Sequence, residues 1–396
     1  MKQFYLYTIA VLLVLVTATS CRDDFDHMKS PDEYTDSSFD EVFEAFWNGM
    51  NNNYVFWDTD PTDWDGIYSK YKPLFRDLDI NDVSDRQKSR EYFVEMTENL
   101  IDSHYTLFFT DETLESVMPS LTRKTKQGLL HPMIPHDYFY DRLDALYLSN
   151  TKKFSGDFTI NGEDKSLTIV AGTIKDYESI VYIHFSGFVL GESFGRIDAI
   201  TEVLNHFGNL VSAKGKNLKG IIIDIRSNGG GNSDDNDFFL GQLIDRPVHY
   251  GYTRSKGGNG RLDYTPWVPA ILKLQPNSAK ITAPIVAVAD LYSFSMAEIT
   301  TMAIKELPNG YFVGETTWGA HGPLIDDTNA LNGGVFKSPF FESVYTSSLM
   351  FKNRDGQLLE NKGVTPDIEV KYNETELENG IDSQLARAIQ LIATGK

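Results

Sequence analysis

The stretch LKGIIIDIRSNGGG, residues 218–231, determines the expected fold class of this chain. Residues 221–225 are apolar apart from Asp224, which is typical of a parallel strand that is covered on both faces. Three glycines, 229–231, follow and allow a tight turn that exposes backbone N–H groups. A buried strand that ends in such a loop predicts an α/β structure in which strands and helices alternate.

The sequence on either side extends this pattern. Apolar runs at 180–183, 284–289 and 311–314 predict further buried strands, and helical spacing predicts helices at 194–210 and 296–306. We therefore expect an α/β domain with a sheet rich in parallel strands from about residue 180 onward.

The preceding part of the chain has a different character. Apolar residues recur at helical spacing over 39–112, so we expect a helical N-terminal domain there. Residues 113–179 predict a β-containing connecting region, with a hairpin turn at the Asn-Gly pair 161–162. Residues 376–396 predict a C-terminal helix.

The first residues predict export. Residues 1–20 combine a basic start, an apolar run and small residues before Cys21, the only cysteine, as in a secretory signal peptide. The apolar run is too short to cross a bilayer. The segment resembles a bacterial lipobox, in which Cys21 is lipidated, although Ala18 stands where leucine is usual. The alternative is an ordinary signal peptide followed by an unrelated cysteine.

Residues 21–38 are polar and read as a flexible tether. The acidic residues just after Cys21 are similar to the surface-export signal of Bacteroidetes lipoproteins. We therefore expect a protein of the cell envelope that is held to a membrane by lipid. The formal net charge of −20 argues against a nucleic-acid partner, because phosphate binding needs a basic surface.

Two strand-to-loop junctions carry candidate chemistry. The glycine loop 229–231 can cradle a phosphate, stabilise an oxyanion or only turn the chain, and the lack of a P-loop lysine disfavours phosphate. Ser295 stands between a predicted strand and a predicted helix. A serine there is either a nucleophile that faces the helix N-terminus or a helix cap.

Four segments together resemble peptidase family S41, which includes the C-terminal processing (tail-specific) proteases and the tricorn core protease. They are GIIIDIRSNGGG (220–231), SFSMAE (293–298), VGETTWG (313–319) and ENKGVTPDIEV (360–370). The resemblance implies a ClpP/crotonase-like α/β peptidase domain over about 180–375, with Ser295 as the nucleophile. It also implies that backbone amides of Gly230 and Met296 hold the oxyanion.

One position departs from the family pattern. The processing proteases use a Ser–Lys pair, and the slot of that lysine holds Ala320 here. The resemblance then implies either an inactive protein or the tricorn-like branch, which uses histidine and glutamate. His321, next to Ala320, is an alternative candidate for the catalytic base. It can also be interpreted as a histidine in a surface turn.

The tricorn-like branch implies a histidine in the helical region. The segment IDSHYTL (101–107), at the end of a predicted helix, resembles the family's Asp-x-His-Thr motif. His104 is then expected to accept the proton of Ser295 and return it to the leaving amine. Ser103 matches a serine that helps complete the site, and Glu360 matches the glutamate of the charge relay. A locally bonded histidine at a helix end is the alternative for His104.

Other polar clusters predict no site. His131 and His136 lack a carboxylate at a familiar metal-ligand spacing, and the acidic run 234–237 lacks the ligand pattern of a calcium loop. No glycine-rich carboxylate-binding loop of a PDZ domain stands out between residues 113 and 178. We expect neither a metal nor another cofactor.

The sequence thus predicts a serine endopeptidase that cleaves exported proteins or peptides through Ser295, His104 and Glu360. The alternative is a catalytically inactive protein of the same fold that binds a peptide or a small apolar ligand. The oligomeric state is left open.

Overall fold

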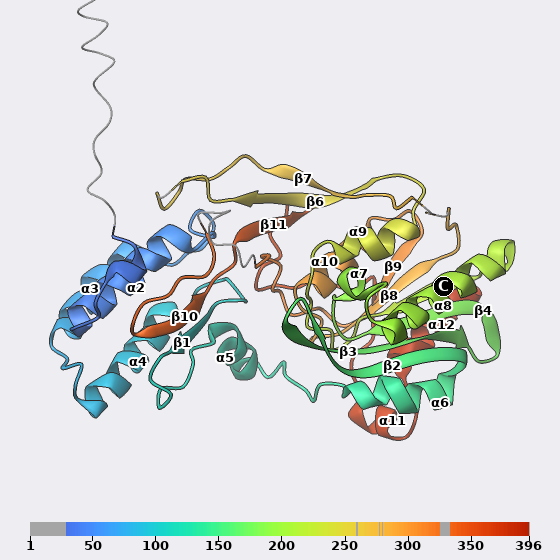
Figure 1. Ribbon diagram of the computed structural model, residues 1–396, viewed down its shortest axis with the longest axis horizontal. Helices are drawn as coiled ribbons and strands as arrows, with labels where there is room; N and C mark the ends of the chain where they lie inside the picture. Colours follow the sequence, from blue (N-terminus) through green and yellow to red (C-terminus); the bar gives the residue numbers. More distant parts are fainter. Residues whose placement is uncertain (1–28, 259, 277, 279, 325–332, 396) are drawn as a thin grey trace, which may run out of the picture.

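The computed structural model describes residues 29–258, 260–276, 278, 280–324 and 333–395. Figure 1 shows a helical body, an α/β body and a three-stranded sheet that runs along one side of both. The helices are η1 (Pro31–Glu33), α2 (Phe39–Asn53), α3 (Trp64–Arg76), α4 (Val83–Thr97), α5 (Pro119–Lys126), η2 (Tyr138–Leu143), α6 (Asp144–Tyr147), α7 (Leu190–Ser193), α8 (Asp198–Lys214), η3 (Gly215–Asn217), α9 (Asp235–Phe239), η4 (Leu240–Gln242), α10 (Met296–Lys305), α11 (Glu374–Glu378) and α12 (Ser383–Thr394). The strands are β1 (Thr106–Phe109), β2 (Leu148–Ile160), β3 (Glu163–Ile174), β4 (Tyr177–Phe185), β5 (Gly220–Asp224), β6 (Val248–Ser255), β7 (Val268–Leu272), β8 (Ile285–Ala289), β9 (Gly310–Gly314), β10 (Phe341–Tyr345), β11 (Leu349–Asn353) and β12 (Ile368–Glu369).

The α/β body is built on a seven-stranded sheet in the order β12-β9-β8-β5-β4-β3-β2. Within this sheet the neighbouring strands β12, β9, β8, β5 and β4 pair in parallel. Strands β2, β3 and β4 are joined by antiparallel pairing. The β2–β3 hairpin turns at Asn161 and Gly162, which both have positive φ. The predicted parallel-rich α/β sheet is therefore confirmed.

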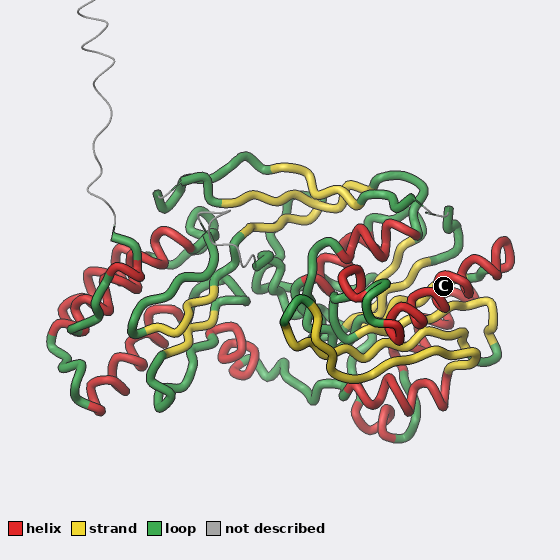
Figure 2. Tube along the Cα trace, viewed as in Figure 1, coloured by secondary structure: helices red, strands yellow, loops and turns green. Residues whose placement is uncertain are grey.

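Helices cover both faces of this sheet (Figure 2). Ile221 and Ile223 of β5 contribute to the core on the face of α8 and α10. Ile222, between them, contributes to the core that contains α12. Because alternate side chains of a strand point to opposite faces, both sets must be apolar, and this explains the unbroken isoleucine run.

The helical body is held together by aromatic packing among α2, α3 and α4. The prediction of helix up to residue 112 is wrong at Thr106–Phe109, which forms β1 and pairs antiparallel with β10. Its partner strand lies more than 230 residues further along the chain, so local spacing could not reveal the pairing. Phe340, just before β10, and Phe341, its first residue, belong to the same aromatic core.

A buried ion network fixes the end of β5, just before the glycine loop. Arg226 contacts Asp224 at 2.6 Å and Asp382, at the start of α12, at 2.8 Å. All three side chains are at most 1% exposed. Since an unpaired buried charge is strongly unfavourable, this network anchors the loop to the C-terminal helix.

None of the helices in the described part of the chain is both long and apolar enough to span a membrane.

Candidate active site

Ser295 lies at the turn between β8 and α10, where it is the N-cap residue of the helix. Its backbone has φ 51° and ψ −114°, a conformation that non-glycine residues rarely adopt. Its N–H donates to Glu298 Oε2 at 3.2 Å. The first serine of the pair, Ser293, is buried and donates its hydroxyl to Ile225 O at 2.8 Å. Ser293 therefore supports the backbone, and Ser295 is the serine at the strained turn.

The glycine loop packs directly against Ser295. A Cβ placed on Gly230, whose φ is +88°, would lie 2.8 Å from Ser295 Cβ and 3.1 Å from Met296 N. Only glycine fits at this contact. The loop backbone therefore runs beside the serine and the first amide of α10.

The two expected oxyanion donors differ in their present partners. Met296 N is the first amide of α10 and donates to no described residue, as expected at a helix N-terminus. Gly230 N donates to Asn228 Oδ1 at 2.8 Å, and the Asn228 amide in turn donates to Phe185 O. The next amide, Gly231 N, has no acceptor among the described residues. An oxyanion at Gly230 has to compete with Asn228.

Glu298 holds the turn in which Ala320 stands at the position of the family's lysine. Its buried carboxylate accepts Thr317 Oγ1 at 2.5 Å, Gly319 N at 2.6 Å and Ala320 N at 2.7 Å, in addition to Ser295 N. One side chain thereby ties the turn after β9 to the serine. Glu298 lies within the SFSMAE segment (293–298), but the sequence alone indicates no role for it.

His321 follows the slot and is only 1% exposed. Its Nε2 lies 3.5 Å from Glu298 Oε1, and neither ring nitrogen makes a hydrogen bond to a described residue. Burial lowers the pKa of His321, while the Glu298 charge opposes this effect. His321 is thus a buried, neutral histidine and not a surface-turn residue.

His104 lies in the turn between α4 and β1, seven residues beyond the end of α4 rather than at the helix end. Its backbone N–H donates to Asp102 Oδ1 at 2.9 Å. Burial lowers the pKa of His104 to about 4, against the opposing charge of Glu298 and with a smaller contribution from His321. The ring is therefore neutral at neutral pH. Its Nδ1 is enclosed without a hydrogen-bond partner among the described residues.

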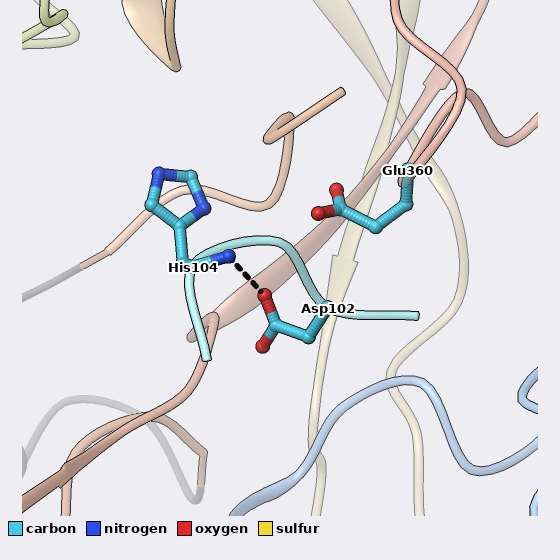
Figure 3. Close-up of side chains that lie close together, drawn as sticks. All are labelled: Asp102, His104 and Glu360. Carbon is cyan, nitrogen blue, oxygen red and sulfur yellow. Dashed lines mark hydrogen bonds between the residues drawn. The ribbon is translucent and has the colours of Figure 1, made fainter. Parts of the chain in front are cut away.

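Glu360 lies beside the His104 ring, and one ring nitrogen faces its carboxylate (Figure 3). The carboxylate accepts Ser103 N at 2.8 Å, His321 N at 2.9 Å and Gly322 N at 3.0 Å. Burial raises the pKa of Glu360 well above its usual value, and the Asp102 charge adds to this, whereas the backbone donors oppose it. Ser103 Oγ is buried nearby without a hydrogen-bond partner in the described part of the chain.

The donor atoms of Asp102, His104 and Glu360 lie within 4.8 Å of one another, close enough for a shared metal ion. The carboxylate oxygens already accept N–H or O–H donors, since Asp102 also accepts Ser347 N and Oγ at 2.7 and 2.9 Å. A cation would have to displace these donors. The arrangement suits two hydrogen-bonded acids that orient an imidazole better than a metal centre.

The sequence-predicted residues thus fall into two groups. In the first group, the backbone of Gly230 packs against Ser295 and Met296. In the second, the carboxylate of Glu360 accepts Ser103 N and lies near the ring of His104. Within the described residues, no hydrogen bond joins Ser295 Oγ to either histidine. Catalytic hydrogen bonds often tighten only when substrate is bound. Cys21 lies outside the described residues.

Two regions of the chain match models of known families. Residues 179–370 match peptidase family S41, and residues 35–103 match the tricorn protease C1 domain. Residues 179–370 belong to peptidase family S41. All four segments that carry the resemblance lie within this S41 domain, and the C1 match ends at Ser103, next to His104.

Curated relatives agree with this assignment. The chain is 27% identical over 176 residues to the tricorn protease of Thermoplasma volcanium and 28% identical over 189 residues to that of Thermoplasma acidophilum. These alignments cover 44% and 48% of this chain but only 14% and 15% of the relatives, so the chain matches a small part of their length.

Solved structures share the fold. A candidate peptidase from Parabacteroides merdae superimposes with a TM-score of 0.64 at 21% identity, over 91% of this chain and 98% of the other. Mature CPAF in complex with lactacystin gives a TM-score of 0.60 at 11% identity, over 91% and 99%. The family model and the curated relatives are those of peptidases, and these solved structures share the fold.

Proposed function

We propose that this protein is a serine endopeptidase in which Ser295 is the nucleophile, His104 the general base and Glu360 the group that orients His104. The observation that carries the proposal is the carboxylate of Glu360, which faces the His104 ring while it accepts Ser103 N and His321 N. A carboxylate held so firmly can fix the tautomer and direction of an imidazole.

In this proposal neutral His104 takes the proton of Ser295 Oγ as the hydroxyl attacks the peptide carbonyl. The imidazolium that forms is stabilised by ionised Glu360, which removes the energetic cost of a charge on a buried ring. His104 then returns the proton to the leaving amine. Water next attacks the acyl-enzyme while His104 takes its proton, and His104 gives this proton to Ser295 Oγ as the acid product leaves.

The oxyanion of the tetrahedral intermediate would be held by Met296 N at the positive end of α10 and by an amide of the glycine loop. Gly230 N can donate to the oxyanion if its hydrogen bond to Asn228 breaks. The alternative donor is the adjacent amide, Gly231 N, which has no acceptor among the described residues. One such donor is typically worth about 3 kcal/mol of barrier.

His104 is a better candidate base than His321. The His104 side chain is half-buried and lies beside Glu360, whose charge can compensate an imidazolium. His321 is fully enclosed, and the nearby Glu298 carboxylate already accepts four donors.

Labelling with a fluorophosphonate probe tests the function directly. The folded protein should be labelled and should cleave peptides in a library digest, and Ser295→Ala should abolish both. Ser233→Ala, which changes an exposed serine near the glycine loop, is the control and should be labelled normally. A folded wild-type protein that is never labelled would refute the peptidase proposal and favour a ligand-binding role.

We also propose that the chain is exported and anchored through lipid on Cys21, which would confine its substrates to exported proteins or peptides. The motif at 17–21 supports this. In a bacterial host that processes lipoproteins, wild type should incorporate labelled palmitate and sediment with membranes. Cys21→Ser should lose both properties, and label on that variant would contradict the proposal.

A further inference from the structure

Lys124 is a buried cation beside the candidate active site. Helix α5 carries it, its side chain is only 6% exposed, and its Nζ lies 4.8 Å from the centre of the Trp318 ring. Among the described residues its Nζ has no ion-pair or hydrogen-bond partner, and its contact is the face of the Trp318 ring. Burying an ammonium group without a counter-ion is unfavourable, so this site is incomplete as it stands.

The nearest acidic groups do not complete it. Glu298 and Glu360 attract Lys124 electrostatically, and they partly offset the fall in its pKa that burial causes. Their oxygens, however, are occupied by backbone N–H and hydroxyl donors. Its neighbour on α5, Arg123, is engaged with Glu98 O and Asn361 Oδ1.

The surface around Lys124 leads to the nucleophile. The Trp318 ring lies 4.6 Å from the Phe294 ring, and Phe294 directly precedes Ser295. Trp318 Nε1 is a buried N–H without an acceptor among the described residues. An aromatic wall next to Ser295 therefore carries two donors that lack partners, Lys124 Nζ and Trp318 Nε1.

We propose that Lys124 determines specificity by binding a carboxylate of the substrate, either its C-terminal carboxylate or an aspartate or glutamate side chain. This inference rests on the proposed peptidase function. A carboxylate would supply the missing counter-ion of Lys124, and in a partly dehydrated site a charged hydrogen bond is stronger than in water. Because the chain carries a net charge of −20, selection of an anionic substrate group requires such a local cation.

Matched peptides test this. A peptide that wild type cleaves in a library digest is remade with a C-terminal carboxylate or amide, and with Asp/Asn or Glu/Gln exchanges at each position. Wild type should prefer the carboxylate at one position by about tenfold or more in kcat/KM, as expected for a hydrogen bond to a charged group. The C-terminal pair and the side-chain pairs distinguish the two sources of the carboxylate.

Lys124→Met, which keeps most of the length of the side chain but removes its charge, should abolish the preference and leave cleavage of the neutral peptide within about twofold. Lys124→Arg should keep part of the preference for the carboxylate peptide. Lys126→Met, exposed on the same helix, is the control for loss of one positive charge and should keep it fully. Thermal unfolding of each variant confirms that it is folded.

Two results obtained with an active wild type would overturn the inference. The first is a wild type that cleaves peptides without any charge preference. The second is a folded Lys124→Met variant that loses activity equally on both members of a pair, which would assign Lys124 to the reaction itself. A folded wild type that neither reacts with fluorophosphonate nor cleaves any peptide refutes the peptidase proposal and this inference with it.

Discussion

Glu360 accepts the backbone N–H of Ser103 at 2.8 Å, across 257 positions of sequence. The same carboxylate accepts the amides of His321 and Gly322 from the S41 domain. One side chain therefore joins the segment that carries His104 to the turn that Glu298 holds against Ser295. The alignment of the proposed base with the proposed nucleophile depends on this junction.

Glu360→Gln should lower kcat by about 10²–10⁴-fold and change KM little, because a neutral amide cannot stabilise the imidazolium. It should also lower the free energy of unfolding by about 1–3 kcal/mol, since the amide NH₂ group faces backbone donors. Steady-state kinetics and urea unfolding measure the two effects. Glu369→Gln, exposed on β12, is the control and should change neither. An unchanged kcat would remove Glu360 from the mechanism.

The rise of kcat/KM on the acid side of its pH profile should reflect the ionisation of Glu360 and not that of His104. The pKa of His104 is lowered to about 4, so its ring is already neutral over most of the acid range. The pKa of Glu360 is raised by burial, so ionisation of this group comes later as pH rises. We expect kcat/KM to increase through the raised pKa of Glu360 when measured between about pH 4 and 9. In Glu360→Gln this rise should move to lower pH, and an unmoved rise would contradict this assignment.

His104 and His321 should differ in their effect on activity. His104→Ala should lower kcat by about 10²–10⁴-fold, as expected for loss of a general base. His321→Ala should lower it by less than about tenfold, because His321 lies against a carboxylate that already accepts four donors. Steady-state kinetics of both variants, with added imidazole as a rescue of His104→Ala, measures the difference. The opposite order of effects would assign the base to His321.

Two neighbouring glycines provide a matched pair in the glycine loop. Gly230→Ala would place its Cβ 2.8 Å from Ser295 Cβ at a φ of +88°, so it should lower stability by about 1–3 kcal/mol and strongly reduce fluorophosphonate labelling. Gly229→Ala meets nothing within 4 Å and has no positive φ, so it should stay within about 0.5 kcal/mol of wild type. Equal behaviour of the two variants would show that the loop does not pack on the serine as described.

The sequence was sufficient wherever a local pattern reflects a local structure. The isoleucine run of β5 and the Asn-Gly turn of the β2–β3 hairpin follow from side-chain alternation and turn chemistry. Ser295 was a nucleophile or a helix cap on position alone, and four ordered motifs that resemble a family decided between the two. The same motifs supplied Glu360, and the further segment 101–107 supplied His104, because each of these residues alone has an ordinary structural interpretation.

Long-range contacts were beyond such patterns. Nothing in the spacing around Lys124 indicates that it meets Trp318, almost 200 residues away. In the same way, the hydrogen bond from Ser103 N to Glu360 depends on how two distant parts of the chain meet in three dimensions. Buried polar contacts of this kind follow from the assembled fold, and a single sequence carries no periodic signal for them.

The aromatic core of the helical body has a consequence for how the protein is made. Phe336, Phe340 and Phe341 belong to that core, and β1 obtains its partner strand only from β10. During synthesis the helices emerge first, but their core stays open until more than 340 residues have been translated. Glu360, which joins the two parts of the site, is added later still. An unfinished chain therefore lacks the assembled site, so any activity of this site can begin only when synthesis is almost complete.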